Sequence, residues 1–157
     1  MARMSLVAVA GLAAALSLVA SCSTLAEMVA SGDPVESRPY DLPREVVWEE
    51  SLRGVKESYR LARSNAADGT FESEWKTNLS PFGGLGFRRR VEGEIVEREG
   101  AYVVSLRVRV EKNSNPDAPL DARRAEWERA DDDTTEAALV LRRIDSVLGR
   151  LERGVPR

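Results

Sequence analysis

The sequence predicts an α+β domain of two layers, in which two amphipathic helices pack on one face of an antiparallel sheet of three or four strands. A helical apolar stripe lies near residue 50, segments with strand-like alternation occupy residues 70 to 112, and a second helical stripe closes the chain. The order helix, strands, helix favours helices gathered on one side of the sheet. The 157 residues, 43% of them hydrophobic and 31% charged, suit one folded domain with additional segments. We assign that domain to residues 41–154.

The first helix is expected after Asp41, a suitable N-cap, with Pro43 in the first turn where no N–H is needed. Its apolar side chains recur at i, i+4, i+7 and i+11, which is one face of a helix. These side chains are Trp48, Leu52, Val55 and Tyr59.

The strands follow. Residues 59–65 (YRLARSN) predict a short strand, and residues 66–69 (AADG) a turn. Residues 70–77 (TFESEWKT) alternate strictly, which places Phe71, Ser73 and Trp75 on one face. Residues 87–99 alternate again, and a turn leads into AYVVSLRVRVEKN, the strongest strand of the chain. These last two strands should form an antiparallel hairpin with one solvated face.

The last helix is marked by Asp133 and Glu136, a start similar to a capping box, and by Gly154 as its C-terminal cap. Its stripe comprises Ala137, Leu141, Ile144, Leu148 and Leu151. The turn-rich segment before it could add a short element around Trp127.

The first 21 residues are typical of a secretory signal. Arg3 supplies the positive start, and an apolar run of about 16 residues, SLVAVAGLAAALSLVA, follows it. A membrane-spanning helix needs roughly 20 such residues. A buried core helix is the alternative, and the position and richness in small residues argue against it.

Val19-Ala20-Ser21-Cys22 resembles the lipobox of bacterial lipoproteins, in which an aliphatic and two small residues precede a cysteine. The resemblance implies cleavage before Cys22 and a lipid anchor with acyl chains such as palmitate. Ser23, which is not aspartate, implies an outer-membrane lipoprotein facing the periplasm of the cell envelope. A plain secretory signal with a cysteine at its cleavage site is the alternative. Residues 22–40, small, polar and interrupted by prolines, predict a lipidated flexible tether.

Residues 41–112 resemble one of the repeated domains of the C lipoprotein of the β-barrel assembly machinery. The resemblance rests on Trp48 in the first helix and on the glycine-led strand from Gly69 to Trp75. These are packing positions rather than chemical groups. The resemblance implies the α+β fold and a place among envelope lipoproteins.

Catalytic chemistry is not predicted. The chain has no histidine and one cysteine, so a Ser-His-Asp or Cys-His arrangement is excluded. Carboxylates such as Glu72, Glu74, Glu92 and Glu94 alternate on the expected solvated face, where surface charge is their simplest role. No acidic segment has the spacing of a calcium loop, and we expect no metal or cofactor. The net charge of −3 argues against a nucleic-acid partner.

Contact with a partner or with the membrane is the remaining role. Phe82 and Leu85, in the glycine-rich PFGGLGF segment, either pack on the core or form an exposed apolar tip. Trp48 and Trp75 are expected in the core, whereas Trp127 lies among charges and is the better contact candidate. We therefore expect a non-enzymatic, protein-binding accessory module in envelope assembly or maintenance, with an unidentified envelope partner. The alternative is a periplasmic carrier or sensor of a small apolar ligand held between helices and sheet.

Overall fold

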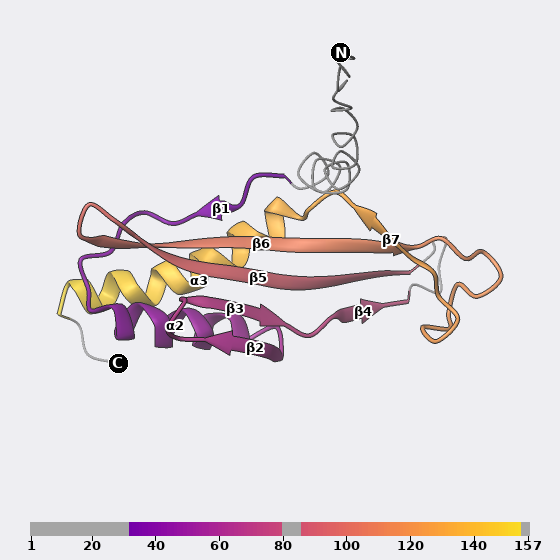
Figure 1. Ribbon diagram of the computed structural model, residues 1–157, viewed down its shortest axis with the longest axis horizontal. Coiled ribbons are helices and arrows are strands. Elements are labelled where there is room, and N and C mark those ends of the chain that lie inside the picture. Colours follow the sequence, from indigo (N-terminus) through magenta and orange to yellow (C-terminus); the bar gives the residue numbers. More distant parts are fainter. Residues whose placement is uncertain (1–31, 80–85, 155–157) are drawn as a thin grey trace, which may run out of the picture.

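The computed structural model describes residues 32–79 and 86–154 (Figure 1). These residues form two helices and one antiparallel sheet of seven strands, so the α+β class is confirmed with more strands than expected. The helices are α2 (Arg44–Lys56) and α3 (Thr134–Glu152). The strands are β1 (Val35–Glu36), β2 (Leu61–Asn65), β3 (Thr70–Ser73), β4 (Lys76–Asn78), β5 (Phe87–Arg98), β6 (Ala101–Asn113) and β7 (Trp127–Ala130).

The predicted β5–β6 hairpin forms the centre of the sheet. Its two-residue turn is Glu99 and Gly100, both with positive φ (54° and 83°), as expected of the turns that match strand twist. The strand order is β1-β6-β5-β3-β2, and further along the hairpin β4 pairs with β5 and β7 with β6.

Alternation along β5 and β6 gives the sheet two different faces. One face is apolar and is covered by both helices, which pack on each other and on this hairpin. The buried side chains of this layer include Val91, Ile95, Val104, Leu106 and Val108 of the sheet and Val47, Val140, Ile144 and Leu148 of the helices. We call the other face, which carries Arg88, Arg90, Glu92 and Glu94 of β5 and Ser105, Arg107, Arg109 and Glu111 of β6, the open face.

The buried side of α2 agrees with the predicted stripe at Val55, and Tyr59 just after the helix is also buried, but the stripe is wrong nearer the start of the helix. Val47, Ser51 and Gly54 are buried, whereas Trp48 and Leu52 are only partly so. A Cβ atom at Gly54 would lie 2.6 Å from Cγ1 of Ile144, so the glycine permits a close approach of the two helices.

The predicted N-cap is confirmed for α3 and wrong for α2. Asp133 caps α3 as predicted, because its side chain accepts a hydrogen bond from the Glu136 N–H at 2.9 Å. Asp41 does not cap α2, which begins after Pro43 in the N-cap position. The Asp41 N–H instead donates to Glu152 at 3.0 Å.

The last residues of the predicted flexible tether belong to the folded domain instead. Val35 pairs with Leu106 in the sheet, and Tyr40 is fully buried and forms a bridge with Tyr102. Arg38 makes ion pairs with α3 at Asp145 (3.0 Å) and Glu152 (2.6 Å). The folded domain therefore begins before Asp41. Sequence reasoning missed this because a two-residue strand between prolines has no periodicity.

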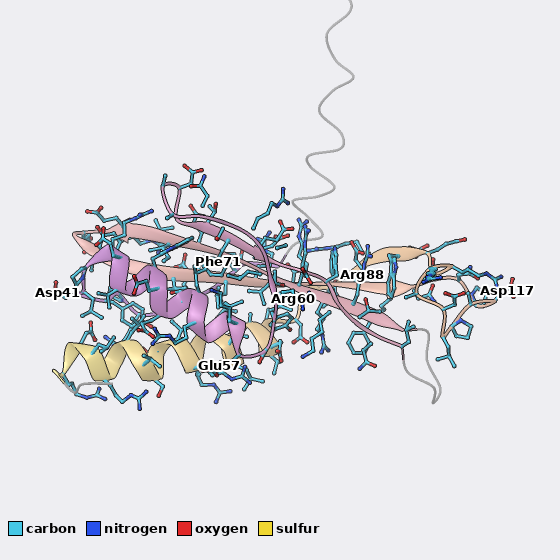
Figure 2. The ribbon with its side chains drawn as sticks, turned by 90° about the horizontal axis from the view of Figure 1, so that it is seen from below. Asp41, Glu57, Arg60, Phe71, Arg88 and Asp117 are labelled. Atoms are coloured by element: carbon cyan, nitrogen blue, oxygen red, sulfur yellow. The ribbon has the colours of Figure 1, made fainter. Side chains whose placement is uncertain are left out.

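One end of the sheet extends beyond both helices (Figure 1). There β4 and β7 flank the ends of β5 and β6, and we call this four-stranded extension, with residues 76–78, 86–90, 109–113 and 127–130, the arm. Figure 2 shows Arg88 on the arm and Asp117, in the connection between β6 and β7, at its far end.

Candidate binding surface on the open face of the sheet

A β-bulge places Trp75 on the open face. Glu72 pairs with Glu92, and Lys76 pairs with Arg89. The chain therefore advances four residues from β3 to β4 while the partner strand β5 advances only three. The extra residue reverses the alternation of side chains. The prediction that Trp75 shares a face with Phe71 and belongs to the core is therefore wrong.

The residues before the bulge follow the prediction. Phe71 and Ser73 are buried on the helix side. The Ser73 hydroxyl accepts a hydrogen bond from the Val91 N–H at 2.9 Å and donates one to the Glu74 carbonyl at 2.9 Å. The side chain thus satisfies backbone groups where ladder pairing is interrupted.

Arginine and tryptophan side chains stack along the open face of the arm. The Arg88 guanidinium carbon lies 4.5 Å from the ring centroid of Trp75 and 4.7 Å from that of Trp127. The Arg90 guanidinium carbon lies 4.8 Å from the Trp75 centroid. Arg88 also pairs with Glu111 at 2.5 Å. These cation–π contacts hold long side chains in a fixed order over strands that no helix covers.

A chain of ion pairs continues from this stack across the sheet. Arg90 contacts Glu72 at 2.8 Å and Glu92 at 2.7 Å. Glu92 also pairs with Arg109 (3.2 Å), and Glu72 with Arg63 (3.0 Å). Each carboxylate is thus shared by two guanidinium groups, which gives the open face a fixed charge pattern.

Asp132 forms a second centre of charge at the same face. Its side chain is only 3% exposed and pairs with Arg107 at 3.3 Å and with Arg129. Burial raises the pKa of Asp132 although both arginines act to lower it. The two guanidinium partners offset only part of the cost of burying this carboxylate.

The middle of the open face is hollowed. The hollow has a volume of about 890 Å³, within the range of roughly 300–1,000 Å³ typical of ligand clefts. Its lining comes from β2, β3, β5 and β6 and includes Arg63, Thr70, Glu72, Glu94, Ser105 and Arg107, with Pro34 beside them. The row formed by Thr70, Glu94 and Ser105 has two short side chains. Longer side chains in the next row, at Glu72, Glu92 and Arg107, form a rim.

The predicted contact residues have different outcomes. Trp127 begins β7, pairs with Asn113 and is partly buried against Arg88, so it belongs to the stack rather than projecting alone. Phe82, Leu85 and Cys22 lie outside the described residues. Strand alternation divides the run Arg88 to Arg90 between the two faces, because Arg88 and Arg90 lie on the open face and Arg89 pairs with Asp133 on the helix side at 3.1 Å.

Sequence reasoning missed the shared role of Trp75, Trp127 and Arg88, and it missed Asp132. The run of arginines was the available signal for the stack. The aromatic partners of Arg88 are Trp75, between β3 and β4, and Trp127 of β7, which are distant in the chain. The order of strands in the sheet therefore brings them together.

The layer between the helices and the sheet, where the alternative of an apolar-ligand carrier would place its ligand, consists of packed side chains. The space between helices and sheet is filled by fully buried side chains, among them Val47, Leu106 and Ile144, whereas the hollow lies on the opposite, polar face. Within residues 32–79 and 86–154, no cluster of acidic, histidine or cysteine side chains is suited to hold a metal ion. None of the helices in these ranges has the length and hydrophobicity needed to cross a membrane.

Comparison with known proteins gives no family assignment. No family model matches the chain, and no curated protein matches it.

Proposed function

We propose that the chain is a lipid-anchored envelope protein, attached through Cys22, that binds a partner protein through the open face and performs no catalysis. The observation that supports binding is the contrast between the two faces of the sheet. One face is sealed by a filled apolar layer, and the other presents an ordered, hollowed array of arginine, carboxylate and tryptophan side chains. Arginine and tryptophan are enriched where proteins bind one another.

The same array supports binding in preference to catalysis. Two carboxylates of the open face, Glu72 and Glu92, are each engaged by two arginines, so their oxygens are held in ion pairs within the array itself. The envelope address rests on the lipobox resemblance, and a role in envelope assembly or maintenance rests on the resemblance to barrel-assembly lipoprotein domains.

The test uses the full-length chain in a bacterium with an outer membrane. A photo-crosslinking residue replaces Thr70 or Thr77, which are exposed on the open face, or Arg142, which is exposed on α3. We expect one partner protein to be captured from both threonine positions and not from position 142. Capture from position 142 alone would contradict the proposal.

A second arm of the experiment tests the anchor. The Cys22→Ala variant should leave the membrane fraction, and the mature wild-type protein should have the mass of a chain lipidated at Cys22. A mature wild-type mass without lipid would refute the anchor and leave the binding face to be judged by crosslinking alone.

A further inference from the structure

We propose that the hollow of the open face receives a lysine or arginine side chain from an extended segment of the partner protein, and that Glu94 is the residue that pairs with it. The inference rests on the proposed function, because it names the chemistry by which the open face recognises its partner.

Glu94 differs from every other charged side chain of that lining. Arg63 and Glu72 pair with each other, Glu92 pairs with two arginines, and Arg107 pairs with Asp132. Glu94 is exposed and makes no ion pair with any residue in the described ranges. The hollow therefore contains one carboxylate whose charge is not compensated by a neighbour.

The immediate surroundings of Glu94 favour a cation. Its cross-strand neighbours on the open face are Thr70 and Ser105, which are short and uncharged, and the next open-face residue along β5 is Glu92. The nearby guanidinium groups are engaged with Glu72, Glu92 and Asp132. A positive side chain entering above the Thr70–Ser105 row gains attraction to Glu94, whereas a negative one is repelled.

The shape of the hollow fits such a side chain. The long rim residues Glu72 and Arg107 stand beside a row in which only Glu94 is long. The aliphatic stem of a lysine or arginine can lie on the short side chains while its charged end reaches the carboxylate. The hollow spans four strands, so the backbone that supplies this side chain can cross the sheet as an extended segment.

The experiment uses the full-length chain purified in detergent and two fluorescently labelled hexapeptides. One alternates threonine with lysine, and the other alternates threonine with glutamate. Binding is measured by fluorescence anisotropy at low and high salt. The variants are Glu94→Gln and Glu94→Lys, and the matched control is Glu97→Gln, which removes an exposed carboxylate from the other side of the same strand.

We expect the wild-type chain to prefer the lysine peptide and to lose that preference at high salt. The Glu94→Gln variant should weaken binding of the lysine peptide by about two- to fivefold, as for a solvent-exposed ion pair. The Glu94→Lys variant should prefer the glutamate peptide, and Glu97→Gln should behave as wild type. Unchanged binding in Glu94→Lys, or an equal loss in Glu97→Gln, would overturn the inference.

Failure of this inference can be distinguished from failure of the proposed function. If a partner is captured from Thr70 and Thr77 but the peptides do not respond to Glu94, the open face binds by other chemistry and only this inference is wrong. If the partner is captured from position 142 alone, the proposed binding face itself is wrong.

Discussion

Gly93 lies between Phe71 of β3 and Leu106 of β6, on the side of the sheet that faces the helices. A Cβ atom at this position would lie 2.1 Å from Cζ of Phe71 and 2.8 Å from Cδ2 of Leu106. Carbon atoms in ordinary contact are about 3.5–4.0 Å apart, so the ring would have to move by about 1.5 Å. Phe71 is 4% exposed and meets Trp48 edge-on at 6.0 Å, which leaves the ring little room.

The Gly93→Ala substitution should therefore destabilise the domain. Overfilling a packed core costs about 1–3 kcal/mol, and alanine recovers about 0.5–1 kcal/mol because it restricts the unfolded chain more than glycine does. We expect a net loss of about 1–2 kcal/mol in the free energy of unfolding, measured by urea denaturation with tryptophan fluorescence. The control is Gly32→Ala, where a Cβ atom would meet nothing within 4 Å and stability should not change.

A double mutant identifies the cause of the loss. Phe71→Leu alone removes buried contacts and should also destabilise. In the double mutant, the smaller leucine side chain at position 71 leaves room for the new methyl group at position 93. The double mutant should therefore lose about 1 kcal/mol less stability than the sum of the losses in the two single mutants. A neutral Gly93→Ala variant, or strictly additive losses, would refute the packing argument.

Substitutions at three further positions, Asp133, Trp75 and Tyr40, test other contacts by urea denaturation. Asp133→Ala removes the cap of α3 and should cost about 1–2 kcal/mol, whereas Asp133→Asn should recover most of the loss if the cap is the cause. Trp75→Ala removes the ring between Arg88 and Arg90 and should cost about 1–2 kcal/mol, from two cation–π contacts of about 0.5–1 kcal/mol each; no loss would show that the stack does not contribute. Burial raises the pKa of Tyr40 from 10.0 to about 12, so its stabilising contribution is complete below pH 10 and is lost as the pH rises through about 12. As the pH is raised from about 9 to about 12, the free energy of unfolding should therefore fall less in Tyr40→Phe than in wild type. An equal fall in both proteins would show that the Tyr40 phenol does not contribute to the pH dependence of stability.

The central hairpin and α3 could be predicted because local sequence and tertiary contacts agree there. β6 has one apolar face throughout the sheet, and α3 has both a capping residue and a regular stripe. In α2 the buried face includes Ser51 and Gly54, whose small size allows the helices to pack closely. These residues are not hydrophobic, so a prediction from hydrophobicity alone placed the buried side on the neighbouring face of the helix.

The open face could be predicted only in part. The division of Arg88 to Arg90 between two sides follows from strand periodicity. The position of Trp75 does not, because the alternation of TFESEWKT continues through the bulge and the extra residue is visible only in the pairing of β3 and β4 with β5. β1 was missed for a related reason, since its pairing with the middle of β6 depends on contacts about 70 residues apart in the chain.

β1 also determines how the domain responds to tension. In a chain anchored at Cys22, the linker from that residue to Pro34 is twelve residues long and could span at most about 40 Å. A force applied through this linker would act first on β1 and the residues next to it. There the Ser37 N–H donates a hydrogen bond to the Val104 carbonyl and the Val104 N–H donates one to the Ser37 hydroxyl, each at 2.9 Å. Peeling residues 35–38 away from β6 would lengthen this linker by about 14 Å. This extension breaks the ion pairs of Arg38 with α3, whereas α2, α3 and the β5–β6 hairpin keep their contacts with one another. In a chain anchored at Cys22, β1 would therefore detach before the core is strained and would give the domain extra reach.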